Sequence, residues 1–180
     1  MNEIELLLEG WANFYLITST AGATLIGLLF VVITLAAERR LERTDKIPIY
    51  LTPTIIYFGS VLYLGALLTF PNHTPLTATF CICLLGVVGL VYTGSLFIGR
   101  DVKTSYYALH DWIPHAGFPF AVYGLLVLGG VLLFSQDDPQ FGLTLVAACM
   151  LLMLAVAIRN SWEIAIEIVS IKTDEENLKI

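Results

Sequence analysis

Long apolar runs alternate with short polar segments along the whole chain. The apolar runs cover residues 11–37, 49–70, 76–98, 114–134 and 141–158. Each run is near or above the roughly 20 residues that a helix needs to cross a bilayer. Each should be helical, because backbone N–H and C=O groups find no other partners in the hydrocarbon core. The pattern predicts an all-α protein, with a single transmembrane domain over residues 1–180 built from five membrane-spanning helices.

The last apolar run continues into a segment that contains no helix breaker. No Gly or Pro occurs from Leu143 to Ile171, so one helix of roughly 44 Å is expected there at 1.5 Å per residue. That length exceeds the roughly 30 Å of the hydrocarbon core. We therefore expect a helical extension over residues 159–172 on the cytoplasmic side of the membrane.

The charges predict how the helices are oriented. The chain is 57% hydrophobic and 13% charged, against about 25% charged in a soluble domain. Its nine Lys and Arg residues are Arg39, Arg40, Arg43, Lys46, Arg100, Lys103, Arg159, Lys172 and Lys179. With five crossings all nine fall on one side, whereas the other side carries Glu3, Glu5, Glu9, Asp137 and Asp138. Cytoplasmic loops are enriched in Lys and Arg, so the N-terminus is expected outside and the C-terminus inside.

Tryptophans lie at the ends of three predicted spans. They are Trp11, Trp112 and Trp162. Trp is enriched at membrane–water interfaces because its amphipathic ring suits the headgroup region. The tryptophan positions therefore agree with the predicted span ends.

Two segments of the chain resemble each other. They are "LGALLTFPNHTP" from Leu64 and "LGGVLLFSQDDP" from Leu128. One interpretation is an internal repeat of two parallel hairpins, formed by the second and third helices and by the fourth and fifth, with the first helix added. The other is convergence, because Leu-rich helices that end in Pro-containing turns resemble one another without common ancestry. The sequence leaves both interpretations open.

Among the five apolar runs, the first, in the first predicted helix, contains the most polar residues. Small and polar residues recur along it at helical spacing, and we take seven as candidate pathway-lining or helix-packing residues: Asn13, Ser19, Thr20, Ala23, Thr24, Gly27 and Thr34. Hydroxyl groups can line a passage for water or ions. They can equally bond to their own backbone, and small residues can serve only for close helix packing.

A polar stripe follows the fifth apolar run. Arg159, Asn160, Glu163 and Glu167 recur at helical spacing there. In a ring of subunits, their carboxylates would gather at a cytoplasmic mouth and attract cations. The alternative is a solvated helix face that only anchors the helix at the interface.

Several functional classes are disfavoured. No Asp, Glu, Lys, Arg or His lies in the middle of an apolar run, whereas proton-coupled transporters usually bury such a group there. Catalytic motifs are lacking, so we do not expect an enzyme. No cofactor or metal is expected either. Cys81 and Cys83 point to different sides of a helix, so they cannot bind one metal ion together. The segment "HDWIPH" contains His110, Asp111 and His115, but no further protein ligand from elsewhere in the chain can be identified for it. Without a large basic patch, nucleic acid is not an expected partner.

One resemblance can be stated from particular segments. "AGATLIGLLFVVITL" followed by a basic loop, and "IRNSWE" after the last apolar run, resemble small bacterial inner-membrane proteins, some of which are labelled modulator of FtsH protease. The resemblance implies a multi-pass protein of the bacterial cytoplasmic (inner) membrane. It transfers no functional residue to this chain.

These observations lead to two functional hypotheses. The first is a self-associating passive conduit, or channel-like assembly, for ions or small solutes, with the first helix nearest the pathway. The second is a non-conducting scaffold or regulatory partner of a larger membrane protein. The expected partners are the lipid bilayer, further copies of the chain in a homo-oligomer and, under the second hypothesis, another membrane protein.

Overall fold

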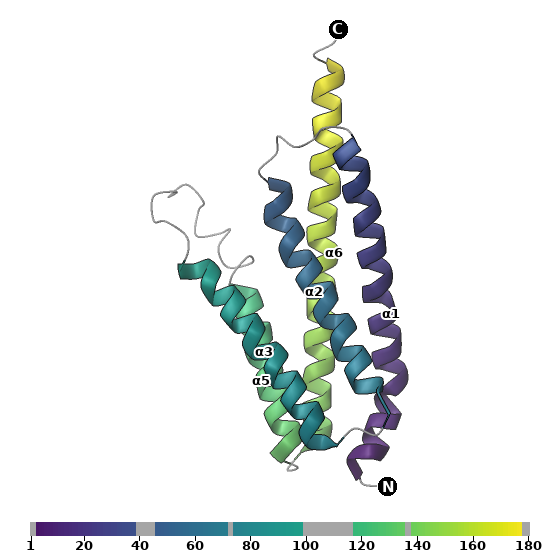
Figure 1. The fold of residues 1–180 in the computed structure, drawn as a ribbon, viewed down its shortest axis with the longest axis vertical. Helices are drawn as coiled ribbons and strands as arrows, with labels where there is room; N and C mark the ends of the chain where they lie inside the picture. Colours follow the sequence, from purple (N-terminus) through teal and green to yellow (C-terminus); the bar gives the residue numbers. More distant parts are fainter. Residues whose placement is uncertain (1–2, 39–45, 72–73, 99–116, 136–137, 178–180) are drawn as a thin grey trace.

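The structure is a computed structural model, and it describes residues 3–38, 46–71, 74–98, 117–135 and 138–177. Within these residues the chain is all-helical. The helices are α1 (Glu3–Glu38), α2 (Lys46–Thr69), α3 (Pro75–Ile98), α5 (Phe118–Ser135) and α6 (Pro139–Asn177) (Figure 1). The prediction of an all-α fold with five long helices is confirmed for the part of the chain that is described.

Every one of these helices is long and apolar enough to cross a membrane. The candidate spans are Leu7–Thr34, Leu51–Thr69, Leu76–Ser95, Phe118–Ser135 and Pro139–Val169. The fourth expected span began at residue 114, and residues 114–116 lie outside the described residues. By length and composition, these five candidate spans indicate a multi-pass membrane protein.

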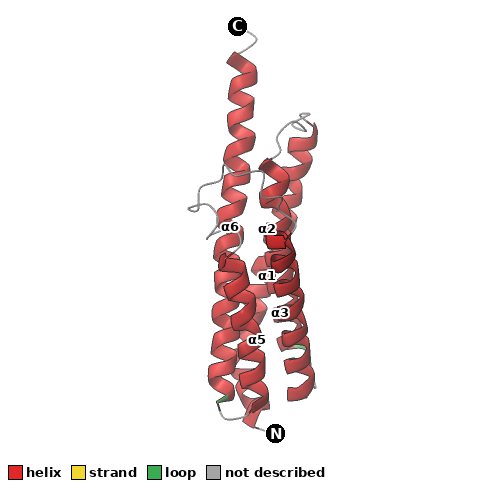
Figure 2. Cartoon of the chain, turned by 90° about the vertical axis from the view of Figure 1, so that its left-hand side faces the viewer, coloured by secondary structure: helices red, strands yellow, loops and turns green. Residues whose placement is uncertain are grey.

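The helices form an elongated bundle in which α6 is the longest member. Helix α1 begins near one end of the long axis, and α6 projects beyond the other helices at the opposite end (Figures 1 and 2). We call the end at which α6 projects the C-terminal end of the bundle, and the opposite end the N-terminal end. Helix α6 is continuous from Pro139 to Asn177, so it includes residues 159–172.

The helices do not pack in the order in which they follow one another. Helix α1 packs along α2, α2 along α6, α6 along α5, and α5 along α3. Helices α2 and α3 are consecutive, but they share only a small contact and diverge toward the C-terminal end (Figure 1). The main partner of α3 is therefore α5, and α2 and α3 do not pack along each other as α5 and α6 do.

Helix capping accounts for the polar residue and the proline at the end of both similar segments. The Thr74 hydroxyl accepts a hydrogen bond from Thr77 N at 3.2 Å, and Asp138 Oδ1 accepts one from Phe141 N at 2.9 Å. In both helices proline follows the cap, where its missing N–H costs nothing. The packing of the segments differs: Leu64 is fully buried, whereas its counterpart Leu128 is 47% exposed. The structure thus favours convergence over a repeated unit.

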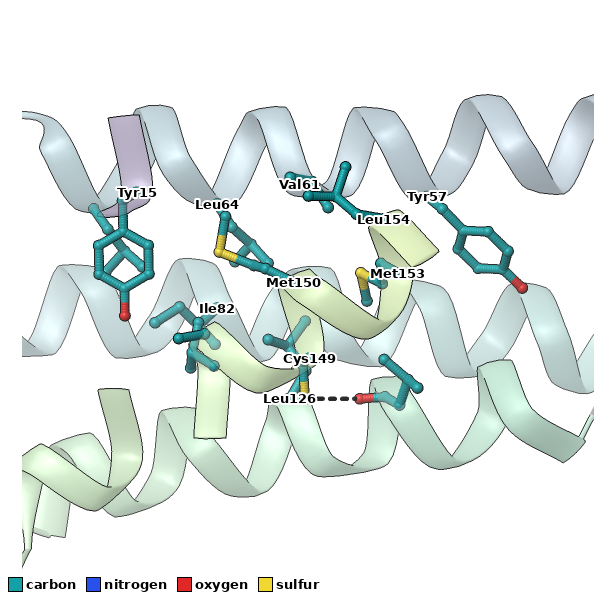
Figure 3. Close-up of a cluster of buried hydrophobic side chains, with 14 of the residues drawn as sticks. Tyr15, Tyr57, Val61, Leu64, Ile82, Leu126, Cys149, Met150, Met153 and Leu154 are labelled. Atoms are coloured by element: carbon teal, nitrogen blue, oxygen red, sulfur yellow. Dashed lines mark hydrogen bonds between the residues drawn. The ribbon is translucent and has the colours of Figure 1, made fainter. Parts of the chain in front are cut away.

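The core lies between α2, α6 and α5. Side chains such as Val61, Leu64, Leu126, Met150 and Met153 interdigitate there (Figure 3). All five are at most 1% exposed. Because lipid tails are as apolar as these side chains, their close packing, and not exclusion from water, holds the helices together within a membrane.

Close backbone approach requires glycine at two crossings. A Cβ atom at Gly65 of α2 would lie 2.6 Å from the carbonyl oxygen of Tyr15 in α1, and closer still to the Ser19 side chain. A Cβ atom at Gly142 of α6 would lie 2.9 Å from the amide nitrogen of Leu133 in α5. Both crossings place backbone against backbone, which only a residue without a side chain allows.

Hydrogen bonds between helices supplement this packing. The Tyr15 hydroxyl of α1 donates to the carbonyl oxygen of Leu143 in α6 at 3.1 Å, in a buried position. The Cys149 thiol of α6 contacts the carbonyl oxygen of Val122 in α5 at 3.6 Å. Such bonds hold neighbouring helices in register within the membrane.

Candidate functional site

The candidate residues of the first helix fall on two sides of α1. Six of them are exposed: Asn13, Thr20, Ala23, Thr24, Gly27 and Thr34. Ser19 is only 6% exposed and packs against Gly65 of α2. Of the two roles that the sequence left open for Ser19, lining a pathway or packing helices, its position therefore matches packing, at the α1–α2 crossing.

The exposed residues belong to a regular stripe along α1. Its members are Gly10, Asn13, Ile17, Thr20, Thr24, Gly27, Val31 and Thr34, and all eight are exposed. Their spacing alternates between three and four residues, which is the heptad spacing of helices that pack along each other. We call these eight residues the outer face of α1. No atom of another described element lies within 4 Å of a Cβ placed at Gly10 or Gly27, so the described part of the chain leaves this face uncovered.

The threonine hydroxyls of this face bond to their own helix. Thr20 donates to the carbonyl oxygen of Leu16 at 2.7 Å, Thr24 to that of Thr20 at 2.8 Å, and Thr34 to that of Phe30 at 2.8 Å. Each hydroxyl has one hydrogen and two acceptor lone pairs. The bonds use the hydrogens, so the face offers acceptor oxygens but no free hydroxyl donor from these three threonines.

The candidate mouth residues lie on the part of α6 near the C-terminal end of the bundle. Arg159 and Glu163 are exposed, whereas Asn160 and Glu167 are half-buried. Glu163 and Glu167 are four residues apart, so their side chains lie on the same side of the helix. These residues belong to α6, whereas the outer face belongs to α1, so the two candidate sites are on different helices.

Metal ligands do not gather in the described residues. No group of three or more His, Cys, Asp or Glu side chains is close enough there to hold a metal ion. Cys81, Cys83 and Cys149 are free thiols in half-buried or buried positions. Three residues of the "HDWIPH" segment, His110, Asp111 and His115, lie outside the described residues, as does Trp112.

A group of tyrosines is a feature that the sequence did not single out. Tyr57 of α2, Tyr92 of α3 and Tyr123 of α5 come together toward the C-terminal end, and Ser60 lies with them. Tyr57 and Tyr123 have ring centroids 6.5 Å apart, and Tyr92 lies in the vicinity of both. We call these four residues the tyrosine cluster. The available signal was the occurrence of three tyrosines inside apolar runs, each near the end expected to face the cytoplasm.

One hydrogen bond within the tyrosine cluster joins α2 to α5. The Ser60 hydroxyl donates to the carbonyl oxygen of Ile56 at 2.8 Å and lies 3.2 Å from the Tyr123 hydroxyl. Because the Ser60 hydrogen is used by Ile56, the Tyr123 hydroxyl is the donor to Ser60.

Comparisons with known protein families, with characterised proteins and with solved structures found no match to this chain.

Proposed function

We propose that this protein is the subunit of a homo-oligomeric membrane assembly in which the outer faces of α1 surround a passive conduit for ions or small solutes. The single observation behind this proposal is that eight positions at heptad spacing are all exposed along α1, and that six of them carry small or polar residues. Membrane helices associate through small residues and polar contacts. A face of this composition is better suited to meeting other copies of α1, or water, than to meeting lipid tails.

The length of the outer face supports a conduit. From Gly10 to Thr34 it extends over roughly 36 Å at 1.5 Å per residue, which covers the roughly 30 Å of the hydrocarbon core. A passage needs such a continuous lining, whereas a packing motif needs only a few turns. The acceptor oxygens of Thr20, Thr24 and Thr34 can coordinate cations in passing, and no formal charge is required.

The proposed orientation has the N-terminus outside and the C-terminus inside the bacterial cytoplasmic membrane. Its support is the concentration of all nine Lys and Arg residues on one side. In that orientation Glu163 and Glu167 of several copies would lie near the cytoplasmic mouth and raise the local concentration of cations. Labelling of the two termini in intact cells tests this arrangement, and a result with both termini on one side would contradict it.

A second candidate is a non-conducting scaffold or regulatory subunit. It is favoured by the hydrogen bonds of Thr20, Thr24 and Thr34 to their own helix, because a face without free hydroxyl donors can also close against another helix. In this case the outer face would be a tight contact with no passage, and α1 would bind a second copy or a larger membrane protein.

Flux through liposomes distinguishes the two functions. Purified protein is reconstituted, and cation efflux is compared between the natural chain and a variant with Thr20→Val and Thr24→Val. Valine keeps the shape and removes the oxygens, so a conduit lined by α1 should lose flux to the level of empty liposomes. Flux that is unchanged in the variant refutes the lining, and no flux from the natural chain favours the scaffold.

Cross-linking tests self-association separately from flux. Gly27→Leu should reduce the oligomer, because it adds a large side chain to the outer face where the single chain leaves space. Gly124→Leu on α5 is a matched control, because a Cβ atom there also meets nothing within 4 Å. An oligomer that tolerates Gly27→Leu as well as Gly124→Leu would contradict a role for α1 in assembly.

A further inference from the structure

The tyrosine cluster contains a buried residue, Tyr57, whose hydroxyl group has no hydrogen-bond partner among the described residues. Tyr57 is 6% exposed, and its hydroxyl makes no hydrogen bond to any residue in the described part of the chain. An unpaired hydroxyl in an apolar environment is costly. The other hydroxyls of the core are paired in most cases, as Ser60 and Tyr123 illustrate. Tyr57 therefore stands out as a hydrogen-bond donor that needs an external acceptor.

This hydroxyl can be reached from outside the bundle. Among the described residues, Thr79 Oγ1 is the fully buried side-chain oxygen or nitrogen atom that lacks a hydrogen-bond partner, so Tyr57 Oη is not such an atom. Tyr57 Oη also lacks a partner but does not belong to the fully buried atoms, so part of it contacts the surroundings. It points from α2 into the region beside α3 and α5 (Figure 3), where α2 and α3 diverge and share little contact.

The depth of the cluster matches the boundary between lipid tails and headgroups. Tyr57 lies six residues after the first residue of its candidate span, and Tyr123 lies five residues after the first residue of its own. Tyr92 lies three residues before the last residue of its span. At 1.5 Å per residue these positions are roughly 5–9 Å within the apolar region. Side chains of a helix lean toward its N-terminus, which for α2 and α5 is the C-terminal end of the bundle. The phenol groups of Tyr57 and Tyr123 thus lean toward the membrane boundary.

We infer that the tyrosine cluster binds one membrane lipid between α2 and α3, with an acyl-ester carbonyl of the lipid accepting a hydrogen bond from Tyr57. The lipid carbonyl is an acceptor only, and Tyr57 supplies the donor that it needs. The half-buried Tyr92 lies across from Tyr57 on α3 and supplies a second phenol group. Tyr123 is not free to donate, because its hydrogen is shared with Ser60; it positions the ring of Tyr57 through their ring contact.

This site is independent of the proposed conduit. It involves α2, α3 and α5, whereas the outer face belongs to α1. Loss of the oligomer or of flux would leave the lipid site in place, and the reverse also holds.

The test compares two lipids that differ only in the carbonyl group. Purified full-length protein in detergent is mixed with a diacyl phosphatidylcholine or with its dialkyl ether analogue of the same chain length, and bound lipid is counted by native mass spectrometry. The ester lipid should be retained roughly three- to tenfold better for each hydrogen bond made to it. Equal retention of the two lipids would overturn the inference, and would mean that water or nothing satisfies Tyr57.

Three variants identify the donor. Tyr57→Phe should lower retention of the ester lipid toward that of the ether lipid, and Tyr92→Phe should lower it less or equally. Tyr63→Phe is the matched control: this tyrosine is on the same helix and is exposed, and its side chain interacts with Cys81 and not with the tyrosine cluster. Retention by Tyr57→Phe equal to that of the natural chain would also overturn the inference. Because each change removes one oxygen atom, the melting temperature of each variant verifies that the bundle is intact.

Discussion

Substitution of Gly65 by alanine tests how closely α1 and α2 must approach. The added Cβ atom would lie 2.6 Å from the Tyr15 carbonyl oxygen, whereas ordinary contacts begin at 3.4 Å. The helices must therefore separate by at least roughly 0.8 Å at this point, the difference between these two distances, because the Ser19 side chain is closer still. The Tyr15 oxygen belongs to the backbone of α1, so it cannot move aside as the end of a flexible side chain would.

The magnitude follows from the cost of overpacking. Inserting a methyl group into a tightly packed site costs about 1–3 kcal/mol, and alanine regains up to about 1 kcal/mol through its better helix propensity. Gly59→Ala on the same helix provides the control, because a Cβ atom there meets nothing within 4 Å. We expect Gly65→Ala to be less stable than Gly59→Ala by about 1–3 kcal/mol.

Unfolding of the purified protein in mixed micelles, with increasing fractions of a denaturing detergent, measures this difference. Helical content and the fluorescence of Trp11, which packs near Tyr15, report on the same contact. A double variant with Ser19→Gly should recover only part of the loss, because it removes the Ser19 side chain but leaves the Tyr15 oxygen in place. If Gly65→Ala is as stable as Gly59→Ala, the close crossing of α1 and α2 is refuted.

Two further predictions concern the polar contacts of the bundle. Tyr15→Phe should lower the free energy of unfolding by about 0.5–1.5 kcal/mol, because it removes the buried hydrogen bond to Leu143; the same unfolding assay with Tyr63→Phe as control checks it, and equal stability of the two variants would contradict it. Asp138→Ala should lower the free energy of unfolding by about 0.5–2 kcal/mol because it removes the cap of α6, and Asp138→Asn should retain most of that stabilisation. Hydrogen exchange of the backbone amides in the first turn of α6 measures the effect. Unchanged exchange in the alanine variant would argue against the cap.

The helices themselves were predictable because the membrane imposes strong local rules. An apolar run of about 20 residues has no alternative to a helix in lipid, so the existence of five long helices follows from composition along the chain. Helix starts at Thr74–Pro75 and Asp138–Pro139 are likewise local, because cap and first-turn preferences involve neighbouring residues only.

The partners of each helix were not predictable from the same signal. Hydrophobic periodicity carries little information inside a membrane, because the lipid-facing and buried sides of a helix are both apolar. Leu64 and Leu128 occupy matching places in two similar segments, yet one is buried and the other faces outward. Contacts such as that of Gly65 with Tyr15 depend on which backbones come close, and this is decided by the whole bundle.

The same division applies to the candidate sites. The sequence alone determined that α1 has small and polar residues at heptad spacing, and that all Lys and Arg residues lie outside the middle of the apolar runs. Only the tertiary structure decided that Ser19 turns inward to α2 while Thr20, Thr24 and Gly27 remain uncovered, and that tyrosines from α2, α3 and α5 meet. The reason is physical: spacing along a helix specifies which residues share a face, but the neighbour of that face depends on packing between segments far apart in the chain.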